Sequence, residues 1–251
     1  MNYYKFHFSP TGGTKKVADA VAEGWGQSFQ SVDLMMPVPH MQLRSDDICL
    51  FAVPSYGGRV PSVVIERFAQ LFGNGARAIL IAVFGNRAID DTLLELSDEL
   101  QKAGFRCIAG IEAVAQHSLL PKYGAGRPDE ADVKELKEFA QKIKDAVEQD
   151  QLSPQLKLPG NRPYQKYNGV PLVPSVIDGC IACQICAQQC PTGAIPMMRP
   201  KSTDVSKCIS CMRCVQVCPK HVRKLSKLMV FGATQIMKKS CSGRKDNKLY
   251  L

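Results

Sequence analysis

Two short cysteine runs are the residues of this chain best suited to chemistry. Each run has the spacing C-x2-C-x2-C-x3-C-P, and the runs begin 28 residues apart. Closely spaced thiolates bind soft metals, because a tight loop can wrap three sulfurs around one metal group. The longer third gap directs the fourth cysteine elsewhere, and the proline after it stops the local turn from continuing. The runs contain Cys180, Cys183, Cys186, Cys190, Cys208, Cys211, Cys214 and Cys218.

The doubled run resembles the two-[4Fe-4S] ferredoxin domain of bacteria, and Cys-Pro-Thr-Gly-Ala-Ile at 190–195 is similar to that family too. The resemblance implies that the fourth cysteine of each run crosses to the cluster of the other run. Cluster one is then expected on Cys180, Cys183, Cys186 and Cys218. Cluster two is expected on Cys208, Cys211, Cys214 and Cys190. Zinc also binds C-x2-C pairs, but eight cysteines in this doubled pattern are unusual for zinc.

The second run departs from that family after its last cysteine. Cys-Pro-Lys-His-Val-Arg at 218–223 lacks the Gly-Ala of the first run. We therefore expect the chain to leave this cluster along a different path.

The charge of the chain is divided between its two halves. Residues 1–150 hold 16 Lys and Arg against 20 Asp and Glu, a net charge of −4, whereas residues 151–251 hold 16 against 3, a net charge of +13. No nucleic-acid motif accompanies the basic half, so we do not expect nucleic-acid binding. Docking on the acidic half, or on an acidic redox partner, is the simpler interpretation.

Strands and helices are expected to alternate through residues 1–150. Apolar runs at 3–8, 48–53, 78–84 and 105–114 have the character of buried parallel strands. Helical periodicity follows them, for example at Val17, Val21 and Trp25, and again from Asp129 onward after Pro128. The pattern predicts an α/β doubly wound, five-stranded parallel sheet, and such sheets bind ligands beyond the carboxyl ends of their strands.

Three polar loops are expected at those carboxyl ends. The first, Phe8–Thr14, reads F-x-x-T-G-x-T, and with the other two it resembles the three flavin-mononucleotide (FMN) loops of flavodoxins. That resemblance implies that loop one binds the phosphate and that loops two and three flank the isoalloxazine. The residues for the phosphate are Ser9, Thr11, Gly12, Gly13 and Thr14. The residues beside the ring are Ser55, Tyr56, Gly57, Gly58, Arg59, Gly85, Asn86 and Arg87.

Loops two and three differ from those of flavodoxins in two ways. Loop three has no aromatic residue, which leaves Tyr56 to cover the ring from one side. Arg59 and Arg87 lie where flavodoxins keep positive charge away, and a cation there favours reduced flavin. The alternative is that both arginines pair with nearby acids such as Asp90 or Asp91.

Composition divides the chain into four segments. Residues 1–150 form the flavodoxin-like domain, residues 151–174 a proline-rich linker, residues 175–222 the small α+β two-[4Fe-4S] ferredoxin-like domain, and residues 223–251 a basic, partly helical tail. The apolar part of the tail is interpreted as a helix packed on the first domain, with a membrane-surface helix as the alternative. Neither a membrane span nor an export signal is recognised, so a cytoplasmic protein is expected.

The two resemblances together indicate a flavodoxin–ferredoxin fusion protein. The favoured function is electron transfer between two [4Fe-4S] clusters and FMN, and to or from redox partner proteins such as ferredoxin or an oxidoreductase. The first alternative is an FMN-dependent reductase of a small substrate that receives electrons through the clusters. A redox sensor or scaffold is the second. No catalytic base or nucleophile is identified in the sequence.

Overall fold

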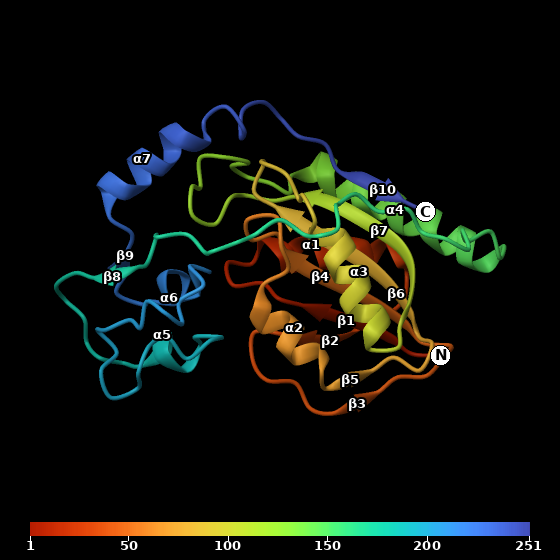
Figure 1. Cartoon of the computed structure of the whole chain (residues 1–251), viewed down its shortest axis with the longest axis horizontal. Helices are drawn as coiled ribbons and strands as arrows, with labels where there is room; N and C mark the ends of the chain where they lie inside the picture. Colours follow the sequence, from red (N-terminus) through yellow and green to blue (C-terminus); the bar gives the residue numbers. More distant parts are fainter.

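A computed structural model describes residues 1–251, and Figure 1 shows a large layered part joined to a small part at one end. The large part contains β1 (Tyr3–His7), α1 (Gly13–Trp25), β2 (Gln30–Asp33), β3 (Met41–Gln42), β4 (Ile48–Pro54), α2 (Ser62–Phe68), β5 (Leu71–Phe72), β6 (Arg77–Phe84), α3 (Thr92–Lys102), β7 (Arg106–Val114) and α4 (Glu130–Glu148). The small part contains β8 (Ser175–Val176), α5 (Ile185–Gln188), α6 (Arg213–Gln216) and β9 (Arg223–Lys224). The chain ends with α7 (Lys227–Met237) and β10 (Lys248–Tyr250).

A six-stranded sheet forms the centre of the large part, in the order β10-β7-β6-β4-β1-β2. Within this sheet, each of the strands β2, β1, β4, β6 and β7 is parallel to the next one in that order. Numbered along the chain, these five are arranged 2-1-3-4-5, which is the flavodoxin-like doubly wound order. The predicted five-stranded parallel sheet is therefore confirmed. The sixth strand, β10, was not predicted: it pairs antiparallel with β7 and brings the end of the chain back to the sheet.

Helices cover both faces of the sheet because each carries an apolar stripe. Helices α1 and α4 pack on one face, with Val17, Val21 and Leu136 in a shared core with strands β4 and β6. Helices α2 and α3 pack on the other face through residues such as Val64 and Leu93. Burial on both faces explains why β4 and β6 are apolar along their length rather than alternating.

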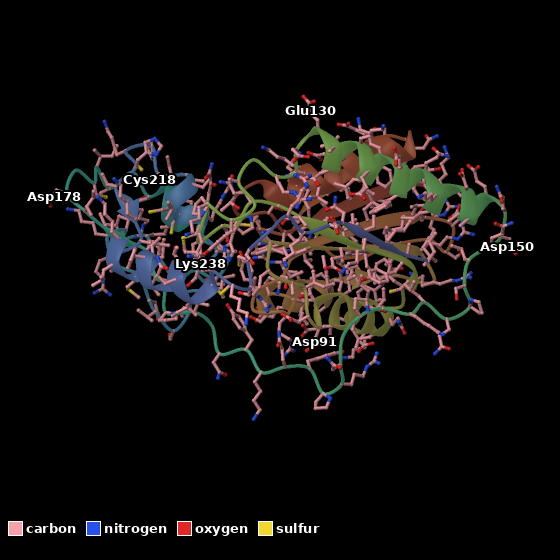
Figure 2. The ribbon with its side chains drawn as sticks, turned by 90° about the horizontal axis from the view of Figure 1, so that it is seen from above. Asp91, Glu130, Asp150, Asp178, Cys218 and Lys238 are labelled. Carbon is pink, nitrogen blue, oxygen red and sulfur yellow. The ribbon has the colours of Figure 1, made fainter.

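The linker runs along the large part before it reaches the small one. Figure 2 shows it passing from Asp150 at the end of α4, by Asp91, toward Asp178. Asp91 accepts the N–H of Asn161 at 2.8 Å and the N–H of Gln165 at 2.7 Å. These bonds fix a segment that the sequence describes only as a semi-rigid connector.

The C-terminal tail also returns to the large part. In α7, Val230, Ala233 and Met237 pack on Leu120 and Tyr123, as the packing interpretation predicts. Leu228, Phe231 and Ile236 of the same helix are exposed. The basic half docks on the acidic half, as expected. The ion pairs between them are Arg162 with Asp98, Arg244 with Asp129 and Asp132, and Lys248 with Glu112.

None of the helices has both the length and the apolar character that crossing a membrane requires.

Candidate functional site

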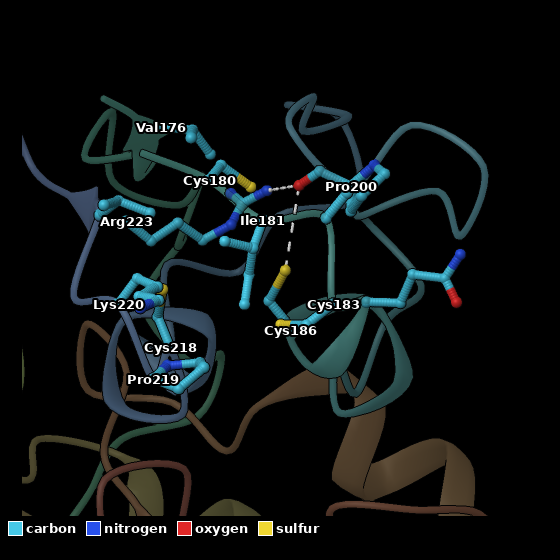
Figure 3. A pocket seen from close by; sticks show the side chains of 13 residues that line it. Val176, Cys180, Ile181, Cys183, Cys186, Pro200, Cys218, Pro219, Lys220 and Arg223 are labelled. Atoms are coloured by element: carbon cyan, nitrogen blue, oxygen red, sulfur yellow. Dashed lines mark hydrogen bonds between the residues drawn. The ribbon is translucent and has the colours of Figure 1, made fainter. Parts of the chain in front are cut away.

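Four cysteines surround a first cavity at the outer end of the small part. Its free space, counted with its open mouth, is about 380 Å³. Figure 3 shows Cys180, Cys186 and Cys218 around this space, with Arg223 and Lys220 beside them. The four are the cysteines that the sequence assigned to cluster one: Cys180, Cys183, Cys186 and Cys218. We call this space cavity one.

The other four cysteines surround a second cavity of about 330 Å³, again counted with its mouth. These are Cys190, Cys208, Cys211 and Cys214. We call this space cavity two. The last cysteine of each run therefore lies at the cavity of the other run, which is the crossed arrangement that the resemblance implies.

The local backbone explains how each run wraps its three thiols. Ala182 and Gln184 have positive φ of 52° and 63°, and Ser210 and Met212, at the same places in the second run, have 52° and 65°. Four non-glycine residues in the left-handed region are costly, and such strain gathers at functional sites. A one-turn helix, α5 or α6, follows the last strained residue and carries the third thiol inward.

The turn after the last cysteine has the same form in both runs. Gly193 follows Cys190 with a φ of 63°, and His221 follows Cys218 at the corresponding place with a φ of 51°. The different path that the sequence suggested begins only after this turn, where the chain enters β9, which pairs with β8 and places Arg223 beside cavity one.

The donor set of both cavities fits an iron–sulfur cube. Each set consists of four sulfurs, the soft ligands that such clusters require. No three His, Cys, Asp or Glu side chains converge as the ligands of a single metal ion do; the thiols instead surround a volume. Burial raises the pKa of the Cys211 thiol to about 12 and that of Cys214 to about 11. Coordination to a metal lowers such values by deprotonating the thiol outright.

Loop one lies between β1 and α1 and has the form of an anion site. Gly12 has a φ of 93°, a conformation that side chains disfavour. Ser9 Oγ accepts the N–H of Lys15 at 2.8 Å. The N–H groups of Thr11, Gly13 and Thr14 have no partner within the protein, so these donors and the helix dipole are available to a phosphate.

Loop two is a tight turn after β4 that the linker covers. Tyr56 and Arg59 pair through their backbones, with Gly57 and Gly58 in positive φ between them. The Tyr167 ring packs so closely on Gly57 that a Cβ there would collide with it. Gln165 Nε2 donates to the Gly57 carbonyl at 2.6 Å. Ser55 Oγ accepts from Thr92 Oγ1 at 2.8 Å, which fixes the start of the turn.

Loop three, after β6, is held by the C-terminal tail. Asn86 Nδ2 donates to the carbonyls of Cys241 at 2.7 Å and Gly243 at 2.8 Å. Gly85 lies against His117, which leaves no room for a Cβ. The three loops lie at the carboxyl ends of neighbouring strands, with a phosphate-type loop beside two flat turns, so the residues present fit FMN.

Both ring-loop arginines pair with carboxylates. Arg59 Nε donates to Glu95 Oε2 at 2.8 Å, and Arg87 forms an ion pair with Asp90. The sequence had raised Asp90 as a partner but not Glu95, which is buried in α3. Because both charges are compensated, the expectation that they favour reduced flavin loses its basis.

Two hydrogen bonds join residues that line cavity two to the large part. Arg213 donates to the Pro10 carbonyl of loop one at 3.3 Å, and Arg67 in α2 donates to the Pro191 carbonyl at 3.0 Å. Burial, together with the neighbouring Cys211 and Tyr167, raises the pKa of the Tyr56 hydroxyl well above its usual range.

Sequence reasoning missed the residues that join these segments. Gln165 and Tyr167 of the linker, Arg67 of α2 and the tail carbonyls that hold Asn86 belong to no recognised motif. The only signal in the sequence was two tyrosines and one arginine within the proline-rich segment.

Comparison with known proteins gives a family match for the small part. Residues 179–223 match the family model of the 4Fe-4S dicluster domain. The flavodoxin of Streptococcus pneumoniae TIGR4 is similar at 19% identity over 59% of this chain and 100% of its own, with a TM-score of 0.42. Flavodoxin 1 from Bacillus cereus matches at 14% identity over 58% of this chain and 98% of its own, also with a TM-score of 0.42.

A longer neighbour is the rubredoxin oxygen:oxidoreductase of the anaerobe Desulfovibrio gigas, at 16% identity over 60% of this chain and 37% of that protein, with a TM-score of 0.41. A search of curated proteins gave no match. The strand order establishes the fold of the large part, and the family model establishes the class of the small one. The chain is therefore a fusion of a flavodoxin-like fold with a C-terminal 4Fe-4S dicluster domain.

Proposed function

We propose that this chain is an electron-transfer protein that binds two [4Fe-4S] clusters and FMN and exchanges electrons with other redox proteins. When bound, the clusters are one-electron carriers and the flavin is a carrier of one or two electrons. The observation that carries the proposal is that cavity two lies against loop one and the core of the large part. Arg213 from α6 contacts loop one, and Ile209, beside Cys208, packs on the core of the large part.

The eight run cysteines are the proposed cluster ligands, in the crossed sets that line the two cavities. Loop one, from Ser9 to Thr14, is proposed to bind the FMN phosphate through its free N–H groups. The turn at Ser55–Arg59 and loop three at Gly85–Arg87 are proposed to flank the ring. The proposal places the protein in the cytoplasm, where thiols stay reduced.

The linker residue Tyr167 supports the ring site from outside it. We expect Tyr167→Ala to weaken FMN binding by about tenfold, because the turn at Gly57 loses the aromatic face on which it packs. Fluorescence titration of the flavin-free protein with FMN measures this. Lys166→Ala, at the exposed neighbouring position, is the matched control and should bind FMN as the unchanged protein does. Equal affinity in both variants would show that Tyr167 does not support the site.

Cavity one is proposed to face the partner protein. Cys183 is exposed, and Ile181 at the same cavity is 59% exposed. Lys220 at the cavity edge and Lys224 just beyond it are exposed and basic. An apolar centre with a basic rim fits an acidic electron carrier, for which charge complementarity steers association.

Anaerobic purification followed by rapid mixing tests the proposed function. We expect about eight iron and one FMN per chain. On mixing with a reduced acidic [2Fe-2S] ferredoxin, the flavin absorbance should bleach, and the rate should fall steeply as salt is added. The variant Lys220→Glu should slow bleaching, whereas Lys142→Glu, on exposed α4, should not. A colourless protein that retains zinc, or a flavin that the ferredoxin cannot reduce, would overturn the proposal.

A further inference from the structure

Arg223 is the largest fully buried side chain of the protein, with 2% of its surface exposed. It lies on β9, where strand alternation turns Arg223 inward and its neighbour Lys224 outward. A buried guanidinium is costly unless its charge is compensated. The buried charge of Arg223 therefore requires a compensating partner.

Four of its five N–H groups are bound, and all of their acceptors are neutral. Nη1 donates to the Pro174 carbonyl at 3.3 Å and to Thr203 Oγ1 at 2.8 Å. Nη2 donates to the carbonyls of Pro200 at 2.6 Å and Ser202 at 3.2 Å. These bonds hold three chain segments together around the guanidinium. They do not neutralise it.

The fifth donor, Nε, is buried and has no hydrogen-bond partner. Arg223 lines cavity one together with Cys180, Cys186 and Cys218, and Figure 3 shows it next to Cys180. The unpaired charge and the unused donor thus lie beside the thiols of cavity one.

We propose that Arg223 is a positioning residue that donates its Nε–H to a sulfur of the cluster in cavity one and raises the reduction potential of that cluster. This inference rests on the proposed binding of clusters by the chain. A cluster becomes more negative when it is reduced, so a buried cation beside it stabilises the reduced form. The same charge is compensated only when the cluster is present, which links iron loading to the stability of the small part.

The test compares three variants with the unchanged, cluster-loaded protein. Arg223→Gln removes the charge, Arg223→Lys keeps it without the guanidinium fork, and Lys224→Gln removes an exposed charge one residue away. Iron and sulfide are measured first, so that absence of clusters from the unchanged protein is recognised as a failure of the proposed function and not of this inference. EPR-monitored redox titration then gives the two cluster midpoints.

We expect Arg223→Gln to lower the midpoint potential of a cluster by at least about 59 mV, which corresponds to a tenfold shift in the redox equilibrium. The midpoint potential of Arg223→Lys should lie close to that of the unchanged protein, and the midpoint potential of Lys224→Gln should equal it. In resonance Raman spectra of the unchanged protein, Fe–S modes should shift in D2O. The shift should be smaller in Arg223→Lys, because the Nε–H donor is absent.

Unchanged midpoints in an iron-loaded Arg223→Gln protein would overturn the inference. If Arg223→Gln binds no iron but Arg223→Lys does, the charge is required, which supports it. Loss of iron from both variants would contradict the inference, because the site would then depend on the shape and packing of the guanidinium group and not on its charge.

Discussion

Alanine at Cys190 is expected to remove the cluster that the second run forms, although Cys190 belongs to the first run. The iron content should fall from about eight to about four per chain. The physical reason is the crossed arrangement: Cys190 lines cavity two with Cys208, Cys211 and Cys214, and cavity one keeps all four of its thiols. Iron analysis and EPR of the reduced protein measure this loss.

Double variants separate the crossed arrangement from an uncrossed one. Cys190→Ala combined with Cys208→Ala should lose no more iron than either change alone, because both remove ligands of the same cluster. Cys190→Ala combined with Cys180→Ala should lose both clusters. The reverse pattern of losses would show that each run completes its own cluster. Cys107→Ala, in β7 away from both cavities, is the control and should keep all the iron.

The cysteine sites were accessible from sequence because their information is local. Spacing alone determines which thiols a short loop can gather, and the positive φ at Ala182 and Ser210 repeats at the same place in both runs. The doubly wound sheet was accessible for a similar reason, since continuous apolar runs such as Ile48–Val53 are typical of strands buried on both faces.

What sequence could not provide is the set of contacts between distant segments. Gln165 meets the Gly57 carbonyl, and Asn86 meets the tail at Cys241, with no periodic pattern at either end. The three-residue strand β10 is too short for alternation to identify it. In the sequence, Arg223 is one of several cations in a basic segment, because its burial depends on loops that meet around cavity one only in the folded chain.

These distant contacts couple the segments around the dicluster domain to the flavin loops. The linker holds loop two, and the tail holds loop three, so both segments that lead to and from the dicluster domain support the flavin loops. Stability of the tail and geometry of the proposed flavin site are therefore coupled.

Asp132→Asn is expected to lower the free energy of unfolding by about 3 kcal/mol, because it breaks a buried ion pair and leaves its partner uncompensated. Asp132 is 2% exposed and pairs with Arg127, whose Nε donates to it at 2.8 Å. It also accepts the N–H of Asp129 at the start of α4 and the side-chain amide of Asn247 from the tail. Denaturant unfolding measures the loss. Glu138→Gln, on the exposed face of α4, is the matched control and should change stability little.

The pH dependence of this variant gives an independent check. Burial opposes ionisation of Asp132, but the Arg127 guanidinium and the Asp129 N–H outweigh it and hold the pKa of the carboxyl below its usual value. A carboxyl with a lowered pKa in the folded state stabilises the protein fully above about pH 4, and this contribution is lost as the pH falls through the lowered pKa. The difference between the unchanged protein and Asp132→Asn should therefore shrink on acidification. A difference that stays constant with pH would assign the loss to packing. Because Arg127 also donates to the Lys245 carbonyl, the variant should loosen the tail, and with it the Asn86 loop and FMN binding.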